Sequence, residues 1–335
     1  MKAYFIIILG FFISLPSLGQ EVKTFNVMFY NVENLFDTID NPQTLDEDFT
    51  PNGKLEYTTT RYHEKLKNLA MVIDSSFSGK SPSILGLCEV ENKNVVEELK
   101  NRISIDNSLA VLHMESPDGR GIDNVILYDS TLFGLKSFGL EQIELGADER
   151  PTRGVLWAVF VERSLNQKLI VLVNHWPSRY GGAEESEWKR VKAAQTSIDL
   201  MDSLHSNNPD AGLILMGDLN DHPDNASVKL LKNCNQGEGP CMTNVHEKYL
   251  GTDKGSHAYR GEWGVLDQIL VNQVILSGEL GWSISKDAGD FVKKPWMLYF
   301  SEKDEDYFPS RSYGGINYFG GFSDHLPAIM TLQLR

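Results

Sequence analysis

Hydrophobic positions along the chain fall into short apolar runs separated by longer segments of mixed polarity. Runs that are almost continuously apolar predict strands buried in a sheet, because a helix of that length would show polar positions on one side. The predicted strands span residues 24–30, 83–90, 109–114, 124–129, 154–162, 168–176, 213–218, 265–271 and 327–334.

Three other segments carry apolar residues at helical spacing. Residues 58–77 repeat apolar side chains three and four positions apart, and Asn92 is placed to cap a short helix that ends near Leu99. A longer helix is predicted over residues 184–205. One face of this helix is predicted to carry Trp188, Val191, Ala194, Ile198, Met201 and Leu204.

The order of these elements restricts the fold class. Residues 109–176 hold several predicted strands with no room for the crossover helices that parallel strands require. A strictly parallel, doubly wound sheet therefore fits poorly. The pattern predicts a single α/β domain over residues 21–335, with sheets packed together and helices on the outside.

The first 20 residues differ in composition from the rest. Lys2 precedes a long apolar run, and Ser17, Leu18 and Gly19 form a small-residue patch after it. This order is typical of a secretory signal peptide, and the run is shorter than the roughly 20 residues of a spanning helix. We therefore assign residues 1–20 to a signal peptide and expect the mature protein to be secreted or periplasmic.

Composition adds two constraints. The 335 residues carry a formal net charge of −15, so a polyanionic partner would be repelled at long range unless bound cations invert the field locally. Of the three cysteines, Cys88 lies in an apolar run and is predicted to be an inert core thiol. Cys234 and Cys241 flank a short loop that a disulfide could close in an oxidising compartment.

Polar side chains stand at the ends of several predicted strands. In LILMGDLNDHP, for example, a buried run is followed directly by Asp218 and Asn220. Any one of these residues could be an ordinary turn former, but their repetition at separate strand ends predicts one shared pocket. The same pattern places Asn31, Glu33, Glu89, Asn174, His175, Asp267, Asp324 and His325 at strand ends.

Several carboxylates in one pocket would raise each other's pKa unless a cation lay between them. Oxygen ligands with few histidines and no cysteine favour Mg²⁺ or Mn²⁺, with Ca²⁺ also possible, over zinc. The zinc-binding spacings HExxH and paired CxxC are absent from the sequence.

The segments FYNVENLFD, LGLCEVEN, VNHWPSR, GDLND, LDQI and SDHLP, in this order, resemble the endonuclease/exonuclease/phosphatase superfamily, which has the deoxyribonuclease I-like fold. The resemblance covers essentially the whole mature chain. It implies a four-layer α/β sandwich of two mixed β-sheets flanked by helices, and metal-dependent hydrolysis of phosphate esters. His175 stands where abasic-site repair enzymes of the superfamily carry tyrosine, so this sequence departs from that branch.

The resemblance also implies roles for individual residues. Glu89 resembles the metal-ligand glutamate, and Asn31, Glu33 and Asp324 are predicted to support the metal. Catalytic roles are predicted for His175, Asp218, Asn220, Asp267 and His325.

Within this set, Asp218 is expected to activate the attacking water, His325 to bind the phosphate, and His175 to protonate the leaving group. Contacts to the substrate phosphate are predicted for Asn31, Arg179, Asn220 and His325. Asp123 is the predicted carboxylate partner that orients His175.

Three functions remain open at this stage. The first is a secreted endonuclease that acts on DNA or RNA by in-line attack of water. The second is an enzyme on another phosphate ester, either a sphingomyelinase-type phospholipid phosphodiesterase, for which the aromatic residues of 296–322 would touch the membrane, or a phosphatase on a small ester. The third is a non-catalytic binding module. We predict a monomer without a stable protein partner.

Overall fold

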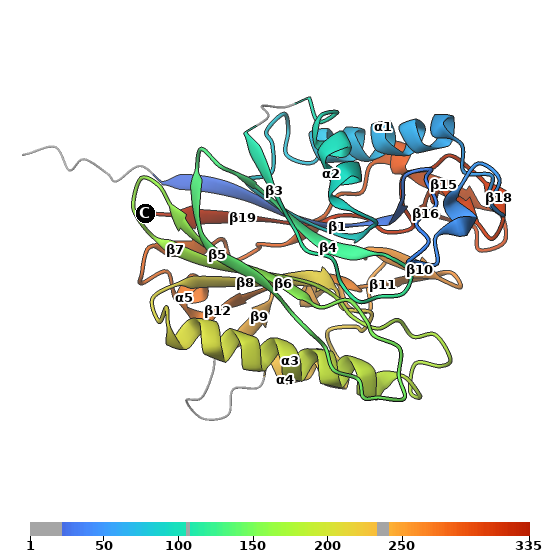
Figure 1. Cartoon of the computed structure of the whole chain (residues 1–335). Helices are drawn as coiled ribbons and strands as arrows, with labels where there is room; N and C mark the ends of the chain where they lie inside the picture. The colour runs from blue at the N-terminus through green and yellow to red at the C-terminus, as the bar shows by residue number, and fades with distance from the viewer. Residues whose placement is uncertain (1–21, 105–107, 233–240) are drawn as a thin grey trace, which may run out of the picture.

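Two β-sheets pack face to face and carry helices on their outer faces (Figure 1). The fold is known from a computed structural model that describes residues 22–104, 108–232 and 241–335. The predicted signal peptide and Cys234 lie outside the described residues, so the export signal and the Cys234–Cys241 disulfide stay predictions. Cys88 is a buried free thiol, as predicted.

The first sheet is built around the N-terminal strand. In spatial order its strands are β13 (Trp282–Ile284), β19 (Ala328–Leu334), β1 (Lys23–Leu35), β2 (Ile84–Val90), β4 (Asp123–Asp129) and β3 (Leu109–His113), and β14 (Asp290–Phe291) also pairs with β19.

The second sheet holds the middle of the chain. Its order is β5 (Phe133–Glu141), β6 (Val155–Glu162), β7 (Lys168–His175), β8 (Gly212–Asp218), β12 (Asp267–Asn272) and β9 (Met242–Asn244). Of these six strands, β5 and β9 were not predicted from the sequence. Most residues of β5 are half-buried or exposed, and β9 is only three residues long, so neither strand gives a continuous apolar run.

Each sheet contains one parallel pair of strands among antiparallel ones. β1 and β2 are parallel, as are β7 and β8, and each pair is joined across a long helix, α1 (Thr59–Ser75) or α3 (Glu187–Ser206). Parallel neighbours need such a crossover, and their carboxyl ends meet at one edge of the sheet. The mixed sheets and the four layers confirm the predicted fold class.

Shorter elements complete the chain. Asn92 caps α2 (Lys93–Lys100) as predicted, by accepting from the backbone N–H groups of Asn94 and Val95. The remaining helices are α4 (Ala226–Lys232), α5 (Gln273–Ser277) and the 3₁₀ turns Glu47–Phe49, Glu247–Tyr249 and Pro295–Met297. Three hairpins stand apart from the large sheets: β10 (His257–Tyr259) with β11 (Glu262–Gly264), β15 (Leu298–Ser301) with β16 (Asp306–Pro309), and β17 (Tyr313–Gly314) with β18 (Asn317–Tyr318).

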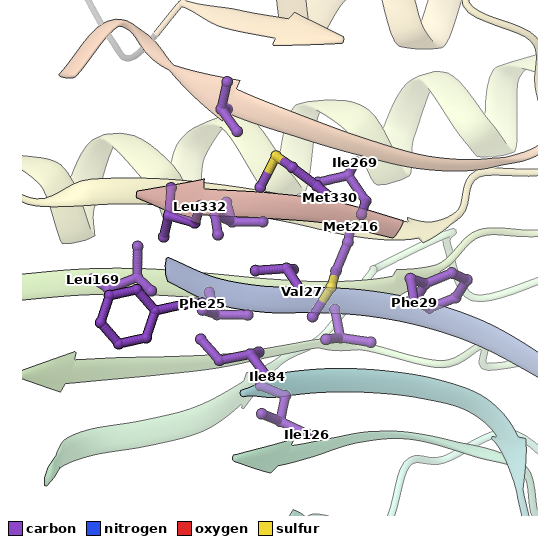
Figure 2. Packing of buried hydrophobic residues seen from close by; sticks show 14 of the residues in the cluster. Phe25, Val27, Phe29, Ile84, Ile126, Leu169, Met216, Ile269, Met330 and Leu332 are labelled. Carbon is purple, nitrogen blue, oxygen red and sulfur yellow. The ribbon is translucent and has the colours of Figure 1, made fainter. Parts of the chain in front are cut away.

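The main core lies between the two sheets (Figure 2). Val27 and Ile84 of the first sheet and Leu169, Met216 and Ile269 of the second belong to this core and are fully buried. There are two further apolar clusters, one between the first sheet and its helices and one between the second sheet and its helices. Strands buried on both faces explain why the sequence shows continuous apolar runs instead of alternation.

The buried face of α3 overlaps the predicted one, because Ala194 and Met201 are buried and Ile198 and Leu204 pack half-buried against the same cluster. It also includes Arg190, Ala193, Ser197 and Leu200, whereas Trp188 is 46% exposed. A buried ion pair explains the position of Arg190, because its guanidinium Nε lies 2.7 Å from a carboxylate oxygen of Asp221. Sequence periodicity treats arginine as a surface residue and cannot anticipate such a pair.

Among the described residues, no helix has both the length and the apolar character needed to cross a membrane. The hairpins β15–β16 and β17–β18 lie at the end of the sandwich opposite the C-terminus (Figure 1). The described residues of this region include several exposed aromatic side chains, namely Trp296, Tyr299, Phe300, Tyr307 and Phe319.

Candidate active site

Backbone irregularities at the ends of β1 and β2 place the first polar side chains. The pairing register shifts between Asn31 and Leu35 on β1 and between Leu87 and Val90 on β2. Glu33, with φ of 50°, and Glu89, with φ of 62°, adopt the left-handed conformation that non-glycine residues avoid. Such bulges redirect side chains at sheet ends, and this strain is typical of functional sites.

Asn31 connects the two sheets at this edge. Its amide nitrogen donates to Glu89 Oε1 at 3.2 Å and to Asp218 Oδ2 at 3.0 Å. Its side-chain oxygen accepts from the backbone N–H of Glu33, which fixes the orientation of the amide. Both donors of the amide are thus used on carboxylates, and Asn31 holds Glu89 and Asp218 at a fixed separation.

Asp218 lies at the centre of the site, at the carboxyl end of β8. Register places it beside His175 on β7 and beside Asp267 on β12. The Nε2 atoms of His175 and His325 each lie 3.8 Å from its Oδ2 atom. Burial raises the pKa of Asp218 to about 6, although the positive charge of His325 opposes the shift.

His325 and Asp267 form a buried dyad. His325 Nδ1 lies 2.6 Å from Asp267 Oδ2, which leaves Nε2 facing Asp218. Burial alone would lower the pKa of His325, but the carboxylates of Asp267 and Asp218 outweigh it and raise this pKa well above the usual value. His325 is therefore an imidazolium at neutral pH.

His175, in contrast to His325, is a neutral imidazole at neutral pH. Burial, together with the positive charge of Arg153, lowers its pKa well below the usual value. Within the described residues its Nδ1 atom has no hydrogen-bond partner, while Nε2 lies 3.8 Å from Glu89 Oε1. A neutral imidazole can accept or donate a hydrogen bond, but it does not hold the spare proton that the predicted general acid requires.

The predicted partner of His175 is wrong. The carboxylate of Asp123 lies 2.8 Å from His113 Nε2 and also accepts from the backbone N–H of Ser116. Asn174 is also excluded from the site, because its side-chain oxygen accepts from Trp176 Nε1 and Ser197 Oγ. Adjacent residues of a strand point to opposite faces, and the sequence alone does not say which of Asn174 and His175 points to the site.

Glu33 is placed behind the site and not at its centre. Its carboxylate accepts from the backbone N–H groups of Ser312 and Tyr313 and lies 3.5 Å from the ammonium of Lys65. Lys65, on α1, also donates to Ser312 Oγ at 2.7 Å. Glu33 and Lys65 thereby anchor the segment that precedes His325, a structural contribution that the sequence analysis did not identify for Lys65.

The sequence around Lys65 contains a feature that indicates its buried position. Lys65 lies on the same helical face as Tyr62, Leu66 and Leu69, where a charged residue is out of place. A lysine within a predicted apolar stripe indicates a buried partner of opposite charge.

Arg179 is anchored to the loop after β8. Its guanidinium donates to the backbone oxygen of Asn220 and to the side chains of Asp221 and Asn225, and its contact with the substrate phosphate stays a prediction. Asn220, with φ of 51°, donates its side-chain amide to the carbonyl of Trp176 at 3.0 Å and its backbone N–H to Asp218 Oδ1 at 3.0 Å.

His257, which the sequence does not single out, also lies beside the site. Its ring centroid is 4.7 Å from that of His325, and the two residues form an isolated backbone bridge. Burial, reinforced by His325, lowers the pKa of His257 to about 3. Nothing near His257 in the sequence identified it, because the contact depends on a hairpin that folds back onto the segment 323–325.

The donor atoms fit a hard divalent cation. Burial raises the pKa of Glu89, and the neighbouring Asp324 raises it further. Of the three groups of described side chains with donor atoms close enough for one ion, two lie at the site: Asp218 with Asp267 and His325, and His257 with Asp324 and His325. While His325 is protonated, its ring has no free lone pair, so the carboxylates are the donors of these groups. Buried carboxylates whose negative charge is poorly compensated are stabilised by a cation, and oxygen donors favour Mg²⁺, Mn²⁺ or Ca²⁺.

Sequence comparison identifies the family. Residues 26–334 match the sequence model of the Endonuclease/Exonuclease/phosphatase family, which is nearly the whole described chain. The chain therefore belongs to this family, whose members are hydrolases of phosphate esters and typically depend on a divalent metal. A search of curated proteins finds no match.

Solved structures share the fold at low sequence identity. A Bacteroides thetaiotaomicron protein of the same family is 14% identical, with a TM-score of 0.58 over 94% of this chain and all of that one. A humanized D. rerio TDP2 is 14% identical, with a TM-score of 0.58 over 92% of this chain and 98% of that one. A B. thetaiotaomicron mannosyl-6-phosphatase is 15% identical, with a TM-score of 0.58 over 92% of this chain and 99% of that one.

Proposed function

We propose that the protein is a divalent-metal-dependent phosphodiester hydrolase that acts on nucleic acid, most simply as an endonuclease. One observation carries this proposal. A carboxylate oxygen of Asp218 faces the Nε2 atoms of two histidines, one charged and one neutral, at 3.8 Å each. These gaps are too long for direct hydrogen bonds and leave space for a substrate oxygen or a water between the groups.

Each residue of the site has a separate role in hydrolysis of the phosphodiester. Asp218, once ionised, is placed to take the proton of an attacking water, and the imidazolium of His325 donates to a phosphate oxygen. His175, being neutral, orients a phosphate or leaving-group oxygen instead of supplying a proton. Glu89 and Asp324 are the residues that would hold a divalent ion, which supplies Lewis-acid stabilisation of the phosphate charge.

Purified mature protein with Mg²⁺ or Mn²⁺ is expected to relax and then degrade supercoiled plasmid DNA. The metal neutralises charge on the phosphate, which an enzyme with a net charge of −15 otherwise repels. Gel electrophoresis over a metal series, with a chelator arm, measures this activity. Activity that survives chelation would contradict the metal assignment.

The same preparation is tested on RNA, sphingomyelin and mannose 6-phosphate. Plasmid that stays intact with every metal, combined with release of phosphocholine from sphingomyelin, would replace the nuclease proposal by the lipid one. The exposed aromatics Tyr299, Phe300 and Phe319 are the observation that favours that second candidate, because aromatic side chains seat at lipid interfaces. Release of inorganic phosphate from the sugar ester alone would favour a phosphatase.

The pH profile of kcat/KM is expected to fall below about pH 6. The carboxylate of Asp218, whose pKa is raised to about 6, must be ionised to accept a proton, so each pH unit below this value removes about nine-tenths of the active form. A bound cation stabilises the ionised form, so a higher metal concentration should move this limb to lower pH. If kcat/KM at low metal concentration does not fall between pH 6 and pH 4, Asp218 is not the base.

Export and a monomeric state are also part of the proposal. They are supported by the predicted signal peptide at residues 1–20 and by the single family domain that occupies residues 26–334. Cell fractionation and light scattering measure them directly.

A further inference from the structure

A cavity of about 730 Å³ lies next to the catalytic residues. Asn220 and His257 line the cavity, and each is close to the site: Asn220 follows Asp218 by two residues, and the His257 ring lies 4.7 Å from that of His325. The rest of the wall includes Tyr180, Tyr259, Trp263 and Leu266, and we call this space the Tyr180 cavity. Its volume falls in the range of sites for small ligands.

Two tyrosines present their rings to solvent at this cavity. Tyr180 is 94% exposed and Tyr259 is 65% exposed, while most large apolar side chains of the chain are buried. Trp263 adds a third, half-buried ring on β11. Exposed aromatic faces that line a cavity beside a phosphate site are suited to stacking on a flat ring of the substrate.

The charges around these rings restrict the chemistry of the ligand. The ammonium of Lys293 lies 4.0 Å from the centroid of the Trp263 ring, and the guanidinium of Arg260 lies 5.1 Å from that of Tyr259. Both rings therefore already interact with a cation. A quaternary ammonium such as choline meets repulsion from these cations and is disfavoured here, whereas an uncharged ring that stacks on the opposite aromatic face is not.

The same cations favour a different ligand. A nucleobase is planar and uncharged, and it is joined through a sugar to the phosphate that the site is built to hold. Arg260 and Lys293 place positive charge at the rings of Tyr259 and Trp263, and Arg179 and Glu262 add one charge of each sign to the cavity wall, in a protein that is acidic as a whole. Charge and shape at the Tyr180 cavity therefore agree with a nucleotide and disagree with a choline lipid.

We propose that the Tyr180 cavity binds the nucleobase of the nucleotide next to the scissile phosphate. This inference rests on the proposed phosphodiesterase activity and deepens it, because it names the group that the enzyme recognises beyond the phosphate. Stacking on Tyr180 and Tyr259 tolerates any base, so the cavity selects nucleotides over other phosphate diesters without selecting a sequence.

The test compares two kinds of diester with the same leaving group. The p-nitrophenyl esters of thymidine 5′-monophosphate and thymidine 3′-monophosphate carry a base, and methyl p-nitrophenyl phosphate does not. The wild-type chain is expected to hydrolyse at least one thymidine ester about ten times more efficiently than the methyl ester. Tyr180→Ala and Tyr259→Ala should each reduce this preference about five- to tenfold, mainly by raising KM, and leave the methyl ester unchanged.

Tyr307→Ala is the matched control. Tyr307 is 53% exposed on β16 and does not line the Tyr180 cavity, so its replacement should change neither substrate. Both cavity tyrosines are exposed, and their removal should not prevent folding. Equal losses on the thymidine and methyl esters, or no loss on either, would overturn the proposal.

A binding measurement separates this inference from the proposed function. Thymidine monophosphate and, separately, phosphocholine are titrated by calorimetry into the wild-type protein and into the Tyr180→Ala and Tyr259→Ala variants, which requires no turnover. Nucleotide binding that either variant weakens supports the Tyr180 cavity even if no diester is cleaved. Two results would overturn the inference: binding of phosphocholine but not of the nucleotide, or nucleotide binding whose affinity is unchanged by either tyrosine substitution.

Discussion

Replacing His325 with alanine is expected to lower kcat on plasmid DNA by about 1000-fold. The change removes an imidazolium that is held in place by Asp267 and directed at Asp218, and a preorganised donor to developing negative charge is worth about 100- to 1000-fold. Loss of the positive charge also leaves Asp218 beside Asp267 without compensation, which makes its ionised form harder to reach. Single-turnover cleavage at saturating metal measures the effect.

His63→Ala is the control for this prediction. His63 is exposed on α1, where its ring lies near Arg102, far from the strand ends that form the site. Both variants should be compared with the wild type in thermal melts, because His325 is buried and His63 is not. A His325→Ala protein that folds and keeps activity within tenfold of the wild type would remove His325 from the mechanism.

Glu89→Gln is expected to raise the metal concentration needed for half-maximal activity by at least about 100-fold. Substitutions beside a metal's direct ligands already weaken binding 10- to 100-fold, so loss of a charged ligand should reach the upper end of that range. Gln keeps the size of the side chain and one acceptor for the amide of Asn31. Direct Mn²⁺ titration, followed by electron paramagnetic resonance, measures the affinity without relying on turnover.

Glu91→Gln is a matched control for Glu89→Gln. Glu91 lies two residues further on, is buried where Glu89 is half-buried, and accepts from the backbone N–H of Asp37 at 2.6 Å. Burial raises its pKa to about 7, so the neutral glutamine resembles a form that Glu91 already adopts near neutral pH. Equal Mn²⁺ affinity in both variants would show that Glu89 is not a metal ligand.

Much of the architecture could be predicted because buried strands leave a strong pattern. The runs 168–176 and 213–218 became β7 and β8, and the helical spacing over 58–77 became α1. The strand β5 was not predicted. Its residues are mostly half-buried or exposed, so its apolar residues are neither continuous nor alternating along the sequence. The buried face of α3 was predicted in part, because Ala194 and Met201 are buried but Arg190, which an ion pair with Asp221 draws inward, was not anticipated.

The residues of the site were predicted more reliably than their contacts. The strand-end pattern and the family resemblance named Glu89, Asp218 and His325, and the structure places them at one edge. The carboxylate partner predicted for His175 was wrong, because Asp123 pairs with His113. Arg179 bonds to the loop after β8, and its contact with the phosphate stays a prediction. His257 and Lys65 were not identified, since each reaches the site through a contact between distant parts of the chain.

The sequence by itself determined the fold class, the family and the list of polar residues at strand ends. These follow from local periodicity and from motifs, both of which are properties of neighbouring residues. Only the tertiary structure decided which of these residues meet, which histidine carries a proton, and where the Tyr180 cavity lies beside them. Protonation depends on burial and on charges within a few ångströms, and those distances are set by the packing of the two sheets.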